Sequence, residues 1–268
     1  MPEHPADEPA GTVVAVDFVR HRNALLARAD FGPLFTDLYL HLAEHGLRHA
    51  EAHDRIFKDA LAAFALHCAS RPAHEHIAWT LSFQLPRLNL FLTGDNEDFL
   101  VAGRVFTENV RTAERNVFFG DTVPRRGAEM RRSVVNFDGA DALKAVEAYY
   151  AGSEQRPARC FYLGGDQYAL LAAHPDCDEA WFAAEDPISI RTVAERETLA
   201  PIERRAYRWA CGCNQRKILG ALAPAWRAGP EELFGGAESI RVQCPRCTAA
   251  HLITRETMEA WVAEAKGG

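Results

Sequence analysis

Cys211-Gly-Cys213 and Cys244-Pro-Arg-Cys247 are two close pairs of thiols, and thirty residues separate one pair from the other. Thiolates bind zinc strongly, and two such pairs can close a tetrahedron around one ion without a water ligand. Cys-x-x-Cys has the spacing of a zinc knuckle, whereas the first pair holds one intervening glycine, which permits the bend that turns both sulfurs to one ion. The pattern predicts one closed Zn²⁺ site, structural or regulatory, formed by Cys211, Cys213, Cys244 and Cys247.

Composition sets the wider class of protein. The chain has 268 residues, of which 48% are hydrophobic, so it can bury a substantial core. Its N-terminal residues 1–8 are acidic and rich in proline, unlike a signal peptide, and no run of about eighteen apolar residues occurs. We therefore expect a cytoplasmic protein, in which the seven cysteines are thiols or metal ligands. A net charge of −7 argues against general affinity for nucleic acid or anionic membranes.

The other reactive side chains have simpler interpretations. Cys68 falls in an apolar helical pattern and Cys160 on a predicted strand, so we expect both thiols to be buried. Cys177 is the best candidate for an exposed thiol among the other three cysteines, although a structural or incidental role is the simpler interpretation. His251 could replace a lost ligand near the second cysteine pair, but with four thiols available a surface or packing role is simpler. Three histidines at i, i+4 spacing could bind a metal on one helix face, although a solvated polar face is the simpler interpretation: His45, His49 and His53. No catalytic triad or carboxylate pair indicates an enzyme.

Hydrophobic periodicity predicts an α+β fold with a mostly antiparallel sheet and helices over residues 13–178, after a disordered tail at 1–12. A helical linker at 179–207 and a small zinc-binding module at 208–268 follow. The predicted helices cover residues 34–42, 56–68, 140–150, a short segment around 219–222, and 256–265. The predicted strands cover residues 77–84, 88–92, 99–106, 116–119, 130–137, 158–163, 168–173 and 239–242.

These residues together resemble a known family. Cys-x-Cys followed by Cys-x-x-Cys, in a C-terminal module behind an α+β domain, is similar to the redox-regulated thirty-three-kilodalton heat-shock protein, a bacterial holding chaperone. The segment from Glu147 to Pro157, which contains Ser153-Glu154-Gln155, resembles that family's aromatic-x-x-Ser-Glu-Gln-x-Pro motif. Pro86-Arg-Leu88-Asn89-Leu90 is a weaker match to its Gly-Pro-hydrophobic turn. The linker departs from the family, because it is short and lacks the usual Leu-rich stretch.

The resemblance implies a redox switch. The reduced protein would hold zinc on the four thiolates and be inactive. Oxidation would form the disulfides Cys211–Cys213 and Cys244–Cys247, release zinc, and unfold the module and then the linker. The exposed apolar surface of the linker and the 13–178 domain would bind unfolded or oxidatively damaged client proteins without ATP. An oxidised homodimer is an open alternative, and the absence of a phosphate-binding loop predicts no nucleotide.

Two other classes of function remain open. The first is a binding module with permanently structural zinc and a nucleic-acid or protein partner, because basic residues cluster before and inside the module: Arg204, Arg205, Arg208, Arg216 and Lys217. Such a cluster is more often a solvated face. The second is a thiol oxidoreductase, which the pattern favours least because Cys244 and Cys247 lack the strand-to-helix setting of a thioredoxin active site.

Overall fold

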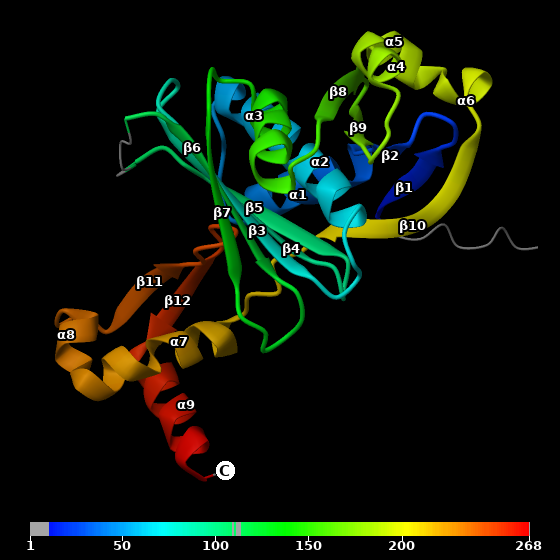
Figure 1. Ribbon diagram of the computed structural model, residues 1–268. Coiled ribbons are helices and arrows are strands. Elements are labelled where there is room, and N and C mark those ends of the chain that lie inside the picture. The colour runs from blue at the N-terminus through cyan, green and yellow to red at the C-terminus, as the bar shows by residue number, and fades with distance from the viewer. Residues whose placement is uncertain (1–10, 109, 111–113, 268) are drawn as a thin grey trace, which may run out of the picture. The chain divides into compact units, whose positions relative to one another are not determined.

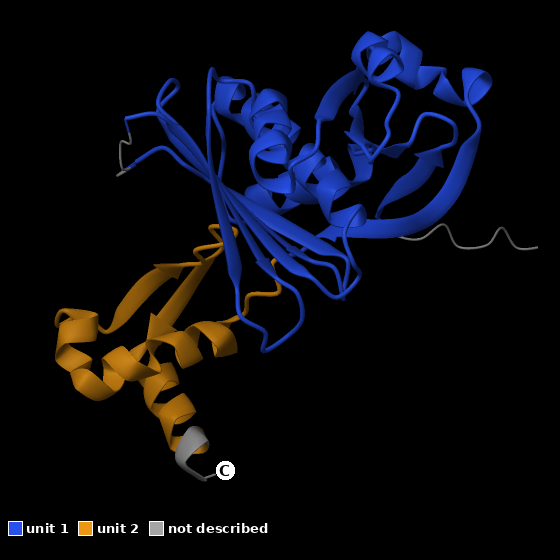
Figure 2. Ribbon diagram, viewed as in Figure 1, with its two compact units in different colours: residues 1–210 blue, residues 211–268 orange. Residues whose placement is uncertain are grey.

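The computed structural model describes residues 11–108, 110 and 114–267, and its contacts divide the chain into two compact units, 1–210 and 211–268 (Figure 2). Most of the predicted disordered tail, residues 1–10, lies outside the described residues. Thr12 already begins the first strand, so the prediction of a tail to residue 12 is wrong at that end. The division after Ala210 falls close to the predicted start of the C-terminal module at residue 208.

Unit 1 is built on one ten-stranded sheet (Figure 1). Its strands are β1 (Thr12–Val19), β2 (Ala24–Asp30), β3 (His76–Phe83), β4 (Leu88–Asp95), β5 (Leu100–Phe106), β6 (Asn116–Val123), β7 (Arg131–Phe137), β8 (Ala158–Gly164), β9 (Gln167–Ala173) and β10 (Leu199–Trp209). Their spatial order is β7-β6-β3-β4-β5-β10-β1-β2-β9-β8. All pairs are antiparallel except β10 with β5, which confirms the predicted α+β class with a mostly antiparallel sheet.

The strand β10 joins the two halves of this sheet. It pairs antiparallel with β1 along its length and parallel with β5 at Arg208 and Trp209. Its side chains alternate, with Arg205, Tyr207 and Trp209 buried and Arg204 and Arg208 exposed. This period of two is the pattern of a half-buried strand. The prediction of a helical linker over 179–207 is therefore wrong from residue 199 onward. The helical prediction rested on alternating acids and arginines such as Glu203-Arg204-Arg205, and pairing with β1 and β5 overrides that local pattern.

Helices pack against the sheet to form the main core. They are α1 (Gly32–Glu44), α2 (Glu51–Ala69) and α3 (Ala142–Tyr149), followed by a π-helical turn at Tyr150–Glu154. The α2 helix is buried over most of its length and contacts strands from both halves of the sheet. Trp79 of β3 lies at the centre of this core, where its ring meets those of Phe64 and Phe118 at 5.0 Å between centroids. These aromatic contacts fasten α2 to the β3–β6 half.

The Ser-Glu-Gln motif lies in and just after the π-helical turn. Asp141 caps α3 by accepting from the backbone N–H groups of Leu143 and Lys144, and Gln155 ends the turn with a φ of +54°. Arg71, which lies just after α2, forms an ion pair with Glu154, with 3.1 Å between the guanidinium nitrogen and the carboxylate oxygen. The motif therefore ties α3 to α2 and leads into β8.

The remaining helices of unit 1 cover a second, smaller core. They are α4 (Glu179–Ala184), α5 (Pro187–Arg191) and α6 (Val193–Arg196). Trp181, Phe182, Ile190 and Val193 from these helices are buried together with apolar residues of β2, β8 and β9. Residues 179–196 thus have the helices predicted for the linker, and they pack on the sheet as part of unit 1.

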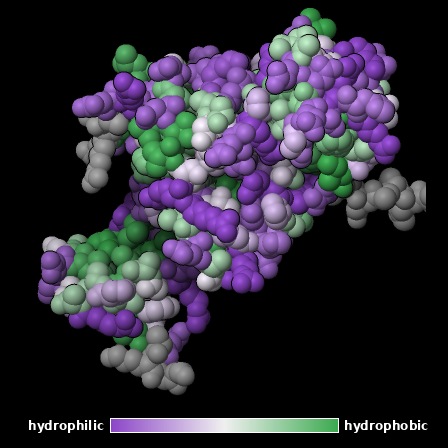
Figure 3. Space-filling model, viewed as in Figure 1, coloured by the Kyte–Doolittle hydropathy of each residue, from purple (hydrophilic) through white to green (hydrophobic). Residues whose placement is uncertain are grey.

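Unit 2 contains a hairpin and three helices: α7 (Gln215–Ala228), α8 (Pro230–Phe234), β11 (Ser239–Gln243), β12 (Ala250–Thr254) and α9 (Arg255–Gly267). Its apolar core is small and consists of Ile218, Leu219, Ala223, Phe234, Ile253, Met258 and Val262. Hydrophobic residues also gather on part of the visible surface of this unit (Figure 3). Leu252 of β12 is 62% exposed.

The predicted strands from β3 to β9 and β11 are confirmed within a few residues at their ends, as are the helices near α1, α2, α3, α7 and α9. A tight turn at Gly164-Gly165-Asp166, with positive φ at all three residues, joins β8 and β9 in a hairpin. The sequence patterns did not predict β1, β2 or β12. These strands are defined by their pairing: β1 pairs with β2 and β10, and β12 pairs with β11.

Candidate metal centre

The first cysteine pair lies on an extended segment that precedes α7. Gly212 has a φ of +63°, which glycine adopts without strain, and this bend separates Cys211 from Cys213. Asn214 then caps α7, because its side chain accepts from the Lys217 backbone N–H at 2.9 Å. The Lys217 ammonium group donates back to the Gly212 carbonyl oxygen at 2.6 Å. The start of α7 thus holds the Cys-Gly-Cys segment from its C-terminal side.

The second pair occupies the turn of the β11–β12 hairpin. The Cys244 backbone N–H donates to Ala249 O at 2.8 Å, and the Thr248 N–H donates to Cys244 O at 3.0 Å. Thr248 has a φ of +68°, so the turn doubles back within a few residues and brings Cys244 and Cys247 to the same side. Arg246 extends from this turn and donates to Cys211 O at 2.8 Å. This bond links the two cysteine segments directly.

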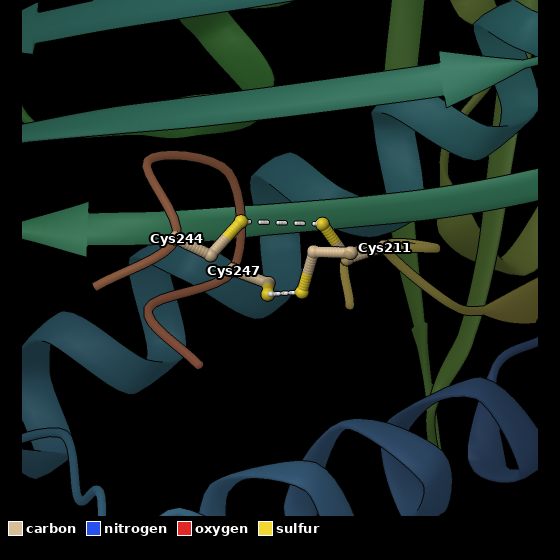
Figure 4. Close-up of side chains that lie close together, drawn as sticks. Cys211, Cys244 and Cys247 are labelled. Atoms are coloured by element: carbon tan, nitrogen blue, oxygen red, sulfur yellow. Dashed lines mark hydrogen bonds between the residues drawn. The ribbon is translucent and has the colours of Figure 1, made fainter. Parts of the chain in front are cut away.

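The four sulfur atoms converge on one point between the two segments. Cys211 Sγ lies 3.6 Å from Cys244 Sγ, and Cys213 Sγ lies 3.6 Å from Cys247 Sγ (Figure 4). All four sulfurs lie within 4.8 Å of one another. Cys244 and Cys247 are 2% exposed, whereas the first pair is half-buried. The structure therefore brings together the four predicted ligands as a cluster that could hold a metal ion.

The pKa shifts at the cluster favour the thiolate form of Cys211 and the thiol forms of Cys213 and Cys247. A hydrogen bond with Cys247 and the positive charge of Arg246 lower the pKa of Cys211 to about 5. Burial, followed by the charge on Cys211, raises the pKa of Cys213 to about 11, and the hydrogen bond with Cys211 raises the pKa of Cys247 above its ordinary value. Four thiolates this close repel one another unless a cation lies between them. The cluster is therefore chemically suited to a cation.

A second group of possible ligands lies in unit 1 and was not predicted from the sequence. His76 and Asp95 are opposite each other on β3 and β4, and Glu97 follows β4. Glu97 is half-exposed and already paired with Arg126 at 2.9 Å. This group is more open than the cysteine cluster, and an arginine competes for one of its carboxylates.

The histidines with i, i+4 spacing do not share a helix face. His45 caps the C-terminal end of α1, His49 lies in the connection, and His53 belongs to α2. The His49 ring contacts the Asp54 carboxylate at 3.4 Å. The prediction of a possible metal site on one helix face is therefore wrong, because α1 ends before His49 and α2 begins after it.

The remaining cysteines and His251 stay outside the metal cluster. Cys68 and Cys160 are buried, as predicted, and burial raises the pKa of each thiol. Cys177 is partly exposed, but burial and the neighbouring Asp178 charge raise its pKa, so it is not an activated thiol. His251 lies opposite Val242 in the β11–β12 hairpin and is not a member of the four-sulfur cluster.

The basic residues considered for nucleic-acid binding are divided between the two units, and one of them is buried. Arg205 is 5% exposed and donates to the carbonyl oxygens of Cys68 and Arg71 at the end of α2. Lys217 is engaged with Gly212, as described above. Arg204 and Arg208 are exposed on β10 in unit 1, whereas Arg216 and Lys217 belong to unit 2.

Among the residues that the structure describes, no helix is long and apolar enough to cross a membrane.

Comparison with known proteins gives a likeness of fold. No protein-family model matches the chain, and no curated protein sequence matches it. Among solved structures, the crystal structure of a 33 kDa chaperonin (heat shock protein 33 homologue) from Thermotoga maritima is similar, with a TM-score of 0.72 and 13% sequence identity. The match covers 97% of this chain and 100% of that one. The resemblance suspected from the motifs is thus confirmed at the level of the fold, which this chain shares with that chaperonin over nearly its whole length.

Proposed function

We propose that this protein is a redox-regulated holding chaperone that acts in the cytoplasm without ATP, by binding client proteins and not by catalysis. The observation that carries the proposal is the convergence of four thiols from two segments of a small C-terminal unit. The shared fold with a 33 kDa chaperonin supports it.

The thiol cluster fits zinc. A tetrahedral site with metal–sulfur bonds of about 2.3 Å has sulfur–sulfur edges of about 3.8 Å. The contacts of 3.6 Å, and the limit of 4.8 Å on every pair, agree with such a tetrahedron. Cys211, Cys213, Cys244 and Cys247 would hold the ion. Zinc would supply a closed structural link and no Lewis-acid catalysis, since no position is left for water or substrate.

Unit 2 needs this link because its own core is small. Units of fewer than about 70 residues rarely reach sufficient stability from hydrophobic burial alone, and metals or disulfides usually supplement them. The Cys211–Cys213 segment has no helix or strand of its own, and it is held to the hairpin turn through the sulfurs and Arg246. Loss of the shared ligands would leave this unit marginally stable.

Oxidation would remove all four ligands. For each disulfide, two thiols lose two electrons and two protons, and one peroxide molecule accepts them to become two molecules of water. The pairs implied by the family resemblance, Cys211–Cys213 and Cys244–Cys247, each lie within one segment. Such disulfides would leave the two segments free to separate, whereas disulfides between the segments would keep them joined.

Client proteins would bind to two surfaces. One is the apolar surface that unfolding of unit 2 exposes, and the other is the sheet domain of residues 13–178. Unfolding of unit 2 would expose its buried apolar residues, among them Phe234 and Met258. In unit 1, the edge strand β7 presents Val134, which is 57% exposed. Exposed apolar patches and strand edges are surfaces on which unfolded chains bind.

The structure of the linker bears on how much of the chain would unfold after oxidation. The family resemblance implies that the linker unfolds after the module. Here residues 199–209 form β10 inside the sheet, so their unfolding would separate β1 from β5. We therefore propose that oxidation unfolds unit 2 and leaves β10 paired within the sheet.

A paired measurement tests the function. The reduced, zinc-loaded protein is treated with peroxide or hypochlorite, zinc release is followed with a chromogenic chelator, and light scattering of a thermally unfolding client is recorded on the same sample. We expect zinc release and suppression of aggregation only after oxidation. Zinc release without suppression would leave a metal sensor that lacks the holding function. Retention of zinc with no suppression would favour the module with permanently structural zinc.

A further inference from the structure

A surface pocket of about 390 Å³ in unit 1 is lined by three arginines from three different elements. Arg28 comes from β2, Arg191 from the end of α5, and Arg204 from β10. Ligand pockets in proteins commonly measure about 300–1,000 Å³, so this pocket has room for a small ligand. None of these arginines belongs to the cysteine site, and the proposed redox function does not use them.

The register of the sheet brings Arg28 and Arg204 to the same row. Ala15 of β1 is directly opposite Arg204 on one side and Arg28 on the other. Directly opposed residues point to the same face of a sheet, and two strand spacings separate the two arginine backbones by about 10 Å. The small side chain of Ala15 leaves a hollow between the two guanidinium groups.

The third arginine is placed over this hollow by α5. Ile190 is fully buried and packs with Leu163 in the smaller core of unit 1, which fixes the last turn of this short helix. Arg191 follows and lies against Gly164 of β8, where a Cβ atom would be 2.9 Å from the guanidinium nitrogen Nη2. Gly164 also has a φ of +86°, so both the space and the backbone favour glycine. The glycine leaves room for Arg191 beside the pocket.

The charges of these arginines are only partly compensated. Arg28 donates to the Asp17 carboxylate at 3.3 Å, and Asp30, which also lines the pocket, accepts from the Gly32 backbone N–H. The side chains of Arg191 and Arg204 have no hydrogen-bond or ion-pair partner among the residues that the structure describes. Two unpaired cations therefore face one pocket in a chain whose net charge is −7.

We propose that this pocket binds a small oxyanion with more than one negative charge, of the phosphate or carboxylate type. The planar guanidinium group matches both kinds of group, with two parallel N–H donors and a permanent charge. The spacing of Arg28 and Arg204 across Ala15 suits a ligand with two charged groups better than a single small ion. Such a ligand would connect β2, β10 and α5, and so would stabilise the folded form of unit 1.

The test is calorimetric titration of the full-length, reduced protein with inorganic pyrophosphate, with citrate as the polycarboxylate probe. We expect one site whose affinity falls as ionic strength rises. Arg204→Gln and Arg191→Gln should each weaken binding about tenfold or more, because each removes a charge-assisted contact. Arg208→Gln is the matched control, since it removes the same charge from an exposed position four residues along β10 and should leave the affinity unchanged.

Binding of either probe with this pattern supports the proposal and identifies which class of oxyanion is preferred. No binding of either probe, or equal weakening by Arg208→Gln, would overturn it. Because both probes chelate divalent cations, the zinc content is measured before and after the titration. The pocket lies wholly in unit 1, so the result is independent of whether the redox proposal holds.

Discussion

The sulfur of Cys211 lies 3.6 Å from the sulfur of Cys244, its partner across the two segments of the metal cluster. Cys213 is in contact with Cys247 in the same way. These two sulfur–sulfur contacts run between the segments, whereas the family resemblance implies disulfides within each segment. Which pairing forms decides whether oxidation opens or fastens unit 2.

We expect the oxidised protein to contain Cys211–Cys213 and Cys244–Cys247, because release of the metal lets the two segments separate before the second disulfide closes. Peptide mapping by mass spectrometry without reduction measures the pairing directly. Cys177→Ser is the control and should leave the map of these four cysteines unchanged. Disulfides between the segments, with unit 2 still folded, would contradict the proposed activation.

Replacement of Cys211 or Cys244 by Ser should abolish tight zinc binding and destabilise unit 2, while unit 1 keeps its structure. The reason is that the metal links two segments of a unit with a small core, whereas unit 1 has an extensive core of its own. Peptide-resolved hydrogen exchange measures both units in one experiment. Loss of protection in β3 and β4 together with α7 would show that the two units do not fold separately.

Oxidation should leave amide protection high in β10 and lower it in α7 and in the β11–β12 hairpin. The strand β10 pairs with β1 from Leu199 to Tyr207 and with β5 at Arg208 and Trp209, so its hydrogen bonds do not depend on the cysteines. Hydrogen exchange of the reduced and oxidised protein compares residues 199–209 with residues 215–254. Rapid exchange of β10 after oxidation would mean that the linker unfolds as the family resemblance implies.

Arg205→Met should lower the free energy of unfolding of unit 1 by about 3 kcal/mol, because it leaves the Arg71 carbonyl oxygen and the Glu203 carboxylate without the Arg205 donor. Arg205 donates to Arg71 O at 2.7 Å and to Cys68 O at 3.3 Å. Urea unfolding followed by circular dichroism measures the change. Arg208→Met, on the exposed face of the same strand, should stay within about 0.5 kcal/mol of the unchanged protein. An equal effect of both changes would show that the loss of stability does not come from the hydrogen bonds of Arg205.

His67 should make unit 1 less stable as the pH falls. Its ring is fully buried beside Tyr150, with 2.8 Å between Nδ1 and the hydroxyl oxygen, and burial, followed by the charge of Arg71, lowers its pKa well below 6.5. The folded state keeps the ring neutral while the unfolded chain takes up a proton, so this contribution is complete above pH about 6.5 and declines below it. The slope is at most about 1.4 kcal/mol per pH unit, down to the pKa of the folded state.

Urea midpoints measured between neutral and mildly acidic pH check this dependence. His67→Gln should flatten the slope, and His74→Gln, at an exposed position, should not. A slope that is the same in both variants would show that other groups cause the loss of stability.

The sequence predicted much of the fold where the deciding interactions are local. Leu143 and Val146 stand at helical spacing in α3, and apolar residues alternate along β3. The four ligands of the candidate metal centre were also predicted as a set, because each pair has a short, characteristic spacing.

The failure at β10 has its cause in pairing over long sequence distances. Tyr207 of β10 is opposite Thr12 of β1, and Trp209 is opposite Val101 of β5, so β10 has no partner strand nearby in the chain. The alternation of acids and arginines before Tyr207 therefore indicated an exposed helix. The histidine spacing failed for a different, local reason, since α1 ends at Glu44 and α2 begins only at Glu51.

By itself, the sequence determined the identity of the four thiols, the α+β class and the separation of a small cysteine module from a larger domain. Only the tertiary structure decided which sulfurs touch, that β10 closes the gap between two half-sheets, and that Arg28, Arg191 and Arg204 share a pocket. The physical reason is that ligand spacing and helix caps are set by neighbours along the chain. Strand partners and pocket walls are instead set by the burial of apolar surface, which brings together residues that are far apart in the sequence.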